Sequence, residues 1–146
     1  MATRLRQVPD PAQGRPRRPG RRLISSGGPW EHAAGYSRAV VVGDSCWVAG
    51  TTDAGPDGRS EHPGDMDGQA RACFHIIDAA LTRAGFSFGD VVRTRMYVTD
   101  VGRAAEAIAV HGEIFADIRP AATLVQVARL IDDSLLIEVE VEARKA

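Results

Sequence analysis

Residues 119–130 read RPAATLVQVARL, and residues 136–140 read LIEVE. Pro120 marks a turn at the start of the first run, because the residue before a proline disfavours helical backbone angles. The apolar residues that follow are typical of a strand, the polar residues 132–134 are typical of a turn, and the second run alternates apolar and acidic residues. This stretch therefore predicts a turn, a strand, a second turn and a final strand whose glutamates share one face.

Two helices are expected before this stretch. Between residues 65 and 85, apolar residues recur at helical spacing, Asp65 or Asp67 can cap the first turn, and Gly85 can end the last one. A second helix is expected from Asp100 or Gly102 to about residue 115. The residues expected along one side of that helix are Ala104, Ile108, His111 and Phe115.

Four further strands are indicated by short apolar or alternating runs. The expected strands are residues 23–25, 36–42, 45–50 and 91–98, and Gly43-Asp44 is expected to join the second and third as a hairpin turn. The segment from 53 to 64 is rich in Gly, Pro and Asp and is expected to be a surface loop.

The predicted order β-β-β-α-β-α-β-β is typical of an α/β fold in which two helices cover one face of a single sheet. The uncovered face would carry basic residues from one strand and acidic residues from another, which makes it too polar for a second core. The residues expected on this face are Arg93, Arg95, Glu138, Glu140 and Glu142. We expect this face to meet further copies of the same chain.

Charge is distributed unequally along the chain. Residues 1–22 hold seven arginines and one aspartate, a balance of +6, whereas the other residues hold 11 basic and 18 acidic side chains, a balance of −7. This first segment has four prolines and few large apolar side chains, so it cannot offset the entropy lost on ordering. The sequence predicts a disordered tail at 1–22 and a single domain at 23–146. An Arg-rich arm can neutralise phosphates, but we favour a solvated extension and do not expect nucleic acid as a partner.

Several classes of protein are disfavoured by the composition. The chain has no run of about 18 apolar residues and no apolar segment near its start that resembles a secretory signal, so we expect a cytoplasmic protein that does not cross a membrane. Cys46 and Cys73 lack metal-ligand spacing and are expected to be buried thiols. His62 has no second ligand nearby in sequence. We expect neither a metal nor a cofactor.

Six short motifs occur in order along the chain, and together they carry a resemblance to a known family. They are GYS-x-AV at 35–40, VAGT at 48–51, QAR at 69–71, DVVRT at 90–94, PA-x-T at 120–123 and VARL at 127–130. In this combination, residues 23–143 resemble the RidA family of imine and enamine deaminases, also called YjgF/YER057c/UK114. The resemblance implies a chorismate-mutase-like α/β (α+β) fold with one mixed six-stranded sheet and two helices on one face. It also implies a homotrimer with a central barrel and three clefts between neighbouring subunits.

The resemblance places the substrate site at the stretch quoted first. In active members this turn reads Pro-Ala-Arg-Ser or a close variant, and the arginine holds the substrate carboxylate while a water molecule attacks the imine carbon. A guanidinium suits this task because its planar fork grips a carboxylate through two charged hydrogen bonds. Ala122 occupies the corresponding position here. The resemblance therefore implies inefficient deamination of 2-aminoacrylate and of 2-imino acids.

Other site residues follow from the same resemblance. Glu138 matches the acidic residue that is thought to orient the attacking water, and Ile108 is nearest to an asparagine that usually contacts the ligand. Tyr36 matches the aromatic residue beside the substrate, Gly50 matches the backbone that lines the cleft, and Thr51 and Thr123 flank these positions.

Two residues are candidates on their own chemistry. His111, whose ordinary pKa is close to neutrality, could act with Glu138 as a second proton-transfer group, or it could be a packed side chain. Arg119 is nearest in sequence to the missing arginine and could replace it, or it could face solvent. Arg38 and Arg95 are further cations that could do the same.

Two functions remain open from the sequence. The chain could be a hydrolase or deaminase that acts on an imine or enamine metabolite, with Glu138 and His111 moving protons. It could instead be a non-catalytic trimer that binds a small metabolite, or has a regulatory role, through the same clefts. Endoribonuclease activity, which is also attached to the family's name, is less favoured because the sequence shows neither paired histidines nor a lysine-rich groove.

Overall fold

The computed structural model describes residues 20–146, so most of the predicted tail at 1–22 lies outside the described residues. The strands are β1 (Arg21–Ile24), β2 (Ala39–Val42), β3 (Ser45–Thr51), β4 (Val91–Val98), β5 (Ala121–Gln126) and β6 (Ile137–Arg144). The helices are α1 (Pro29–Ala34), α2 (Met66–Ala84) and α3 (Ala104–Phe115), with short 3₁₀ turns at Phe88–Asp90 and Val101–Arg103.

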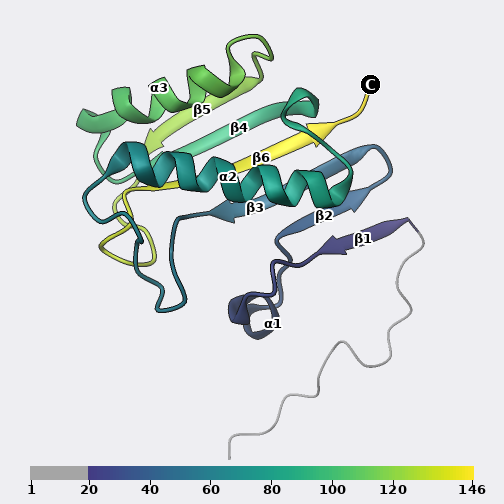
Figure 1. The fold of residues 1–146 in the computed structure, drawn as a ribbon, viewed down its shortest axis with the longest axis horizontal. Coiled ribbons are helices and arrows are strands. Elements are labelled where there is room, and N and C mark those ends of the chain that lie inside the picture. Colours follow the sequence, from purple (N-terminus) through teal and green to yellow (C-terminus); the bar gives the residue numbers. More distant parts are fainter. Residues whose placement is uncertain (1–19) are drawn as a thin grey trace, which may run out of the picture.

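One six-stranded sheet organises the chain, in the order β1-β2-β3-β6-β4-β5. β4 and β5 run parallel and the other neighbours run antiparallel, so the sheet is mixed. Figure 1 shows α2 and α3 lying side by side across the same face of this sheet. The predicted fold class, one mixed six-stranded sheet with two helices on one face, is confirmed.

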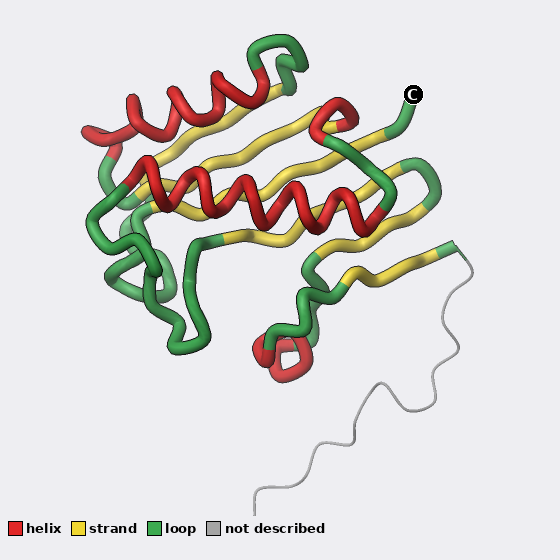
Figure 2. The backbone as a smooth tube through the Cα atoms, viewed as in Figure 1, coloured by secondary structure: helices red, strands yellow, loops and turns green. Residues whose placement is uncertain are grey.

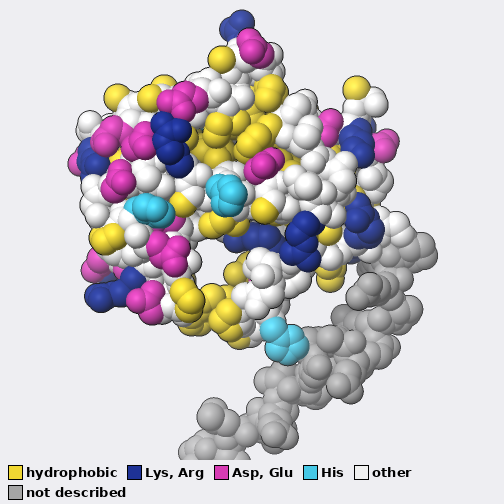
Figure 3. All heavy atoms as spheres, viewed as in Figure 1, with side chains coloured by type: hydrophobic (Ala, Val, Ile, Leu, Met, Phe, Trp, Pro, Cys, Tyr) yellow, Lys and Arg dark blue, Asp and Glu magenta, His cyan; other side chains and the backbone are white. Residues whose placement is uncertain are grey.

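The core lies between the two long helices and the sheet. It contains α2 residues at helical spacing, such as Cys73, Ile77 and Leu81, packed on alternate residues of β6. The Asp65 side chain caps α2 by accepting a hydrogen bond from the Gly68 amide, and Gly85 ends the helix in a left-handed conformation. Figure 3, which views the helix side, shows acidic and basic side chains gathered over α2 and α3. The opposite face of the sheet has no helix over it within the described residues.

Several elements differ from the sequence expectations. β1 begins at Arg21, two residues earlier than expected, and β2 begins at Ala39 rather than residue 36. β4 also departs from a strict alternation of buried and exposed residues at its start. The pairing of β4 with β6 shifts register between Val91 and Arg93, so Val91 is buried and Val92 is exposed.

The short helix α1 is not among the elements expected from the sequence. It is held by Glu31, a buried side chain whose carboxylate accepts hydrogen bonds from Ser26 N and Oγ at 3.0 and 2.7 Å, from Gly28 N at 3.2 Å and from Arg38 N at 2.9 Å. Burial alone would raise the pKa of Glu31, but these hydrogen bonds outweigh it and hold the pKa below its ordinary value. One side chain therefore ties the segment after β1 to the start of β2.

Glu31→Ala is expected to reduce the free energy of unfolding by about 3 kcal/mol, because several partly buried hydrogen-bond donors lose their acceptor at once. The lowered pKa means that the native contribution is present above the ordinary pKa of a glutamate and is lost as pH falls through the folded value. Urea unfolding at pH 7 and at acid pH measures both effects. Glu113→Ala removes only an exposed ion pair with Arg71 and should leave the free energy of unfolding nearly unchanged. Equal losses for the two variants at pH 7 would contradict the assignment.

Candidate functional site

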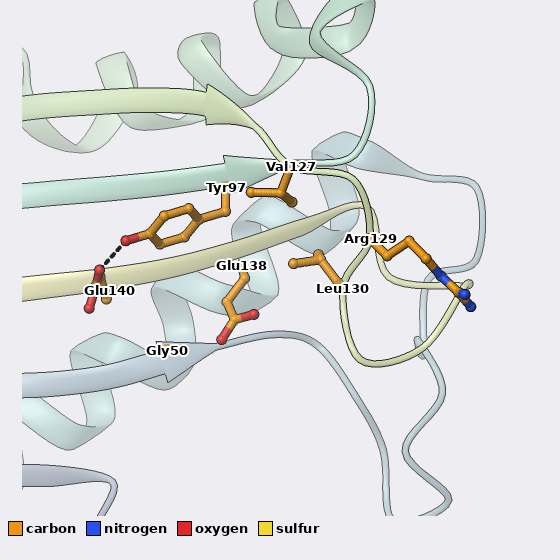
Figure 4. Close-up of a pocket in the computed structure, with 7 residues that line it drawn as sticks. All are labelled: Gly50, Tyr97, Val127, Arg129, Leu130, Glu138 and Glu140. Carbon is orange, nitrogen blue, oxygen red and sulfur yellow. Dashed lines mark hydrogen bonds between the residues drawn. The ribbon is translucent and has the colours of Figure 1, made fainter.

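A hollow of about 400 Å³ opens on the uncovered face of the sheet. Its floor is formed by the C-terminal ends of β3 and β4 and the N-terminal end of β6. Its wall is formed by the segment that follows β5. The lining residues, labelled in Figure 4, are Gly50, Tyr97, Val127, Arg129, Leu130, Glu138 and Glu140. The hollow combines carboxylates, an aromatic ring and apolar walls, which is typical of a small-molecule site.

Gly50 shapes the floor of the hollow. It lies where the pairing of β3 with β6 shifts register, between Val48 and Thr51. A Cβ atom at residue 50 would collide with Oε1 of Glu138, so any side chain here would displace that carboxylate. The glycine of the VAGT motif therefore makes room for Glu138, and Figure 4 shows the carboxylate directed toward the Gly50 backbone.

The Glu138 carboxylate is the group best suited to proton transfer in the hollow. Burial raises the pKa of Glu138, repulsion from Glu140 raises it further, and the Arg38 guanidinium opposes both effects. No hydrogen bond to the Glu138 side chain contributes to this balance within the described part of the chain. A half-buried carboxyl group with a raised pKa accepts a proton more readily than an ordinary glutamate, which suits it to general acid–base catalysis.

Arg38 is the residue immediately before β2. Its Nη2 donates a hydrogen bond of 2.6 Å to the carbonyl oxygen of Gly50. Its Nε is buried and has no acceptor among residues 20–146. Arg38 therefore supports the backbone at Gly50 and places a positive charge near Glu138.

On the uncovered face, Tyr97 and Arg95 of β4 contact glutamates of β6. Tyr97 donates a hydrogen bond to Glu140, and this bond, followed by burial, raises the pKa of Tyr97. Arg95 Nη1 lies 2.9 Å from Oε1 of Glu142. These pairs leave Glu138 as the carboxylate of β6 without a partner in the described residues.

Gln69 holds the wall of the hollow in place. Its buried side-chain amide donates to the carbonyl oxygens of His62 and Ser134 at 3.1 and 3.0 Å, and its oxygen accepts a 2.8 Å hydrogen bond from the Leu136 amide. The Ser60 amide also donates to Ser134 Oγ at 2.8 Å. The loops at 52–65 and 127–136 therefore lie side by side, as Figure 2 shows, and both fix the start of β6.

His111 lies on the opposite side of the sheet from Glu138. Its Nε2 is 2.8 Å from Thr94 Oγ1, and its ring packs 4.7 Å from the ring of Phe115, centroid to centroid. Thr94 faces the helices, whereas Tyr97 and Glu138 face the hollow. Burial lowers the pKa of His111. Within one chain the structure does not bring the two candidate proton-transfer residues together.

The remaining candidate residues lie at several places around the sheet. Thr51 is buried and its carbonyl accepts a hydrogen bond from Cys73 Sγ, whereas Ile108 is 55% exposed on α3, where the buried side is formed by Ala107 and Val110 instead. The expected buried side of α3 is thus wrong at Ile108. Tyr36 is exposed before β2.

The turn before β5 places its residues at the edge of the sheet. Arg119 is exposed and adopts a positive φ of 55° after α3. Ala122 is exposed and pairs with Thr94, so it shares the helix-covered face, whereas Thr123 pairs with Arg95 on the uncovered face. Of the nine candidate residues, Gly50 and Glu138 line the hollow of a single chain.

Some lining residues were not predicted as site residues. Glu140 was placed on the correct face by its alternation with Glu138, and Val127 to Leu130 belonged to a recognised motif. Tyr97 follows Arg93 and Arg95 at two-residue spacing on β4, which is the signal that could have placed it there. What was missing was the position of that motif over β6, which depends on Gln69 and on contacts between distant loops.

Across residues 20–146, His, Cys, Asp and Glu side chains do not gather in groups of three or more that could hold a metal ion. His62 instead pairs with the buried Asp53 at 3.0 Å. Over the same range, none of the helices combines the length and apolarity needed to cross a bilayer.

The fold and the hollow define a small α+β protein with a ligand-sized site on the uncovered face of its sheet. Residues 29–145 match the family model described as Endoribonuclease L-PSP. A solved structure of Rv2704 from Mycobacterium tuberculosis, a member of the YjgF/YER057c/UK114 family, is 43% identical, with a TM-score of 0.78 over 86% of this chain and 99% of that one. The chain therefore belongs to the YjgF/YER057c/UK114, or RidA, family.

Curated relatives support the same assignment. An uncharacterised protein of Streptomyces coelicolor, SCO2049, is 38% identical over 128 residues, which is 84% of this chain and 90% of the relative. The putative reactive intermediate deaminase TdcF of Escherichia coli is 30% identical over 111 residues, 74% of this chain and 83% of TdcF.

Proposed function

We propose that the chain is a cytoplasmic homotrimer that binds a small metabolite in clefts between subunits and hydrolyses an imine or enamine there. The observation that carries this proposal is Glu138, a half-buried carboxylate with a raised pKa beside the open backbone of Gly50. Its support also includes the family membership and the 30% identity to a protein named as a reactive intermediate deaminase.

Glu138 supplies the acid and base steps of the proposed reaction. The carboxylate takes a proton from a water molecule as the water oxygen attacks the imine carbon, and the electron pair of the C=N bond moves to nitrogen, which then takes this proton from Glu138. The carbinolamine then collapses: Glu138 accepts the hydroxyl proton, the C=O bond forms as the C–N bond breaks, and Glu138 gives the proton to the leaving nitrogen, which departs as ammonia. Imine and water become carbonyl compound and ammonia, so no oxidant or cofactor is required.

Ala122 sets the substrate range in this proposal. The methyl group of alanine cannot hold a carboxylate, whereas each charged hydrogen bond from a guanidinium is worth about 1.5–3 kcal/mol. Arg119, the nearest cation in sequence, is exposed in a left-handed conformation at the turn before β5. Imines that depend on a carboxylate clamp, including those derived from 2-aminoacrylate, are therefore expected to be poor substrates.

One experiment tests assembly and activity together. The full chain is fractionated with light scattering, where a mass of about three times 15.6 kDa is expected, and the trimer fraction is incubated with freshly generated 2-iminopropionate and with a carboxylate-free alkyl imine. Ammonia release above the uncatalysed rate is expected for the alkyl imine. A monomeric mass would contradict the proposed cleft between subunits. Ammonia release at the uncatalysed rate from both imines would contradict the proposed hydrolase activity.

A non-catalytic binding or regulatory trimer is the second candidate. It is favoured by the separation of Glu138 from His111, which lie on opposite faces of one sheet and leave a single proton-transfer group in the hollow. The same assay separates the two, because a binding protein would retain ligand without releasing ammonia.

A further inference from the structure

Negative side chains outnumber positive ones in the lining of the hollow around Glu138. Glu138 and Glu140 both line it, and Arg129 is the lining residue with a positive charge. The guanidinium of Arg129 is 2.8 Å from Oδ1 of Asp133, and Figure 4 shows the side chain extending away from both glutamates. Arg129 is therefore neutralised at the rim and is not directed at a ligand on the floor.

The non-polar parts of the hollow suit an organic cation. Val127 and Leu130 supply apolar walls, and Figure 4 shows the ring of Tyr97 extending from β4 toward Glu140 on β6. The hydroxyl group of Tyr97 donates a hydrogen bond to Glu140, which fixes the position of the hydroxyl oxygen while the ring borders the hollow. An aromatic ring beside carboxylates attracts ammonium groups both through the ring electrons and through direct charge pairing.

Arg38 is the cation that opposes this arrangement. Its Nη2 is bound to the Gly50 carbonyl, and its attraction to Glu138 offsets part of the repulsion between the two glutamates. Arg95 lies opposite Glu140 in the pairing of β4 with β6 and also attracts it. The guanidinium of Arg95 forms its ion pair with Glu142, however, so Glu140 shares this positive charge with a second carboxylate and is only partly compensated. A positive ligand group placed between Glu138 and Glu140 would relieve their mutual repulsion.

We infer that the hollow selects small organic cations, such as alkylammonium groups or protonated imines with a short apolar body, rather than carboxylate-bearing metabolites. This inference uses the same hollow as the proposed function and rests on it. A protonated imine is the more electrophilic form, so carboxylates that stabilise the positive nitrogen would also favour attack by water.

Three probes of similar size and different charge test the selectivity: butylammonium, butanol and butanoate. Chemical-shift titrations of the full chain at neutral pH and low salt should give about tenfold tighter binding of butylammonium than of butanoate. Glu140→Gln should weaken butylammonium binding severalfold. Glu142→Gln is the matched control, because Glu142 lies on the same strand and face but pairs with Arg95 outside the hollow, and it should leave binding unchanged.

The outcomes separate this inference from the proposed hydrolase. Equal or tighter binding of butanoate, no binding of any probe, or equal losses in the two variants would overturn the charge selectivity. Cation binding without imine hydrolysis would support the selectivity and count against the enzyme. Hydrolysis that is faster for 2-iminopropionate than for a carboxylate-free imine would support the enzyme and overturn the selectivity.

Discussion

Glu138→Gln is expected to lower kcat/KM for imine hydrolysis by about 10²–10⁴-fold, the usual contribution of a positioned general base. The amide has nearly the same shape as the carboxylate but cannot accept a proton from water. Because Glu138 forms no hydrogen bond in the described chain that the amide would break, the loss should appear without disruption of the fold. Steady-state kinetics with a carboxylate-free imine measures the change.

The same variant is expected to be slightly more stable than the natural chain at pH 7. The raised pKa of Glu138 means that the folded state favours the protonated carboxyl, so its contribution to stability is present below the ordinary glutamate pKa and is lost as pH rises through the folded value. Solvent screening limits the gain to about 0.5 kcal/mol. The difference from the natural chain should vanish at about pH 4, below the ordinary pKa. Urea unfolding across this range measures it.

Glu142→Gln is the control for both effects, because it changes an acid on the same face of β6 that lies outside the hollow. It should leave kcat/KM within about twofold, since it neither touches the substrate nor tunes Glu138 directly. A Glu138→Gln protein that retains full activity would show that another group activates the water. A loss of both activity and stability would indicate a structural role instead.

The periodicity of β6 explains why half of the site could be predicted. Its alternation placed Glu138, Glu140 and Glu142 on one face, and any antiparallel strand with one buried face must keep that order. The α2 helix was predictable for a similar reason, since its apolar stripe, its Asp65 cap and Gly85 agree with one another.

Other features depend on contacts that no local pattern encodes. The bulge that exposes Val92 arises from the register of β4 against β6, and α1 depends on the Glu31 carboxylate, which gathers amides from both sides of the helix. Ile108 was expected on the same side of α3 as Ala104 and Phe115, but it is exposed, because the helix presents Ala107 and Val110 to the core instead. The wall of the hollow likewise needs the hydrogen bonds of Gln69 to distant loops.

Ala122→Arg is expected to raise the hydrolysis of 2-iminopropionate by about 10- to 100-fold, the value of one charged hydrogen bond of about 1.5–3 kcal/mol to the substrate carboxylate. Ala122 is exposed on β5 at the edge of the sheet, so a longer side chain has room to extend. It shares the helix-covered face with Thr94, opposite the face that holds Glu138 in the same chain. In the proposed trimer, a guanidinium here would therefore act on substrate in a cleft shared with a neighbouring copy.

Ala121→Arg adds the same charge one residue earlier, on the uncovered face beside Arg93, and should give no comparable gain. Rates for 2-iminopropionate and for a carboxylate-free imine, measured on trimer fractions of both variants, separate a specific clamp from a general effect of charge. A gain confined to the carboxylate substrate and to Ala122→Arg would mean that the cleft keeps the geometry of an imino-acid deaminase and lacks only the cation. No gain in either variant would mean that other cleft positions, Ile108 among them, have also diverged, since a clamp increases the rate only where the remaining groups already hold the reacting carbon near the water.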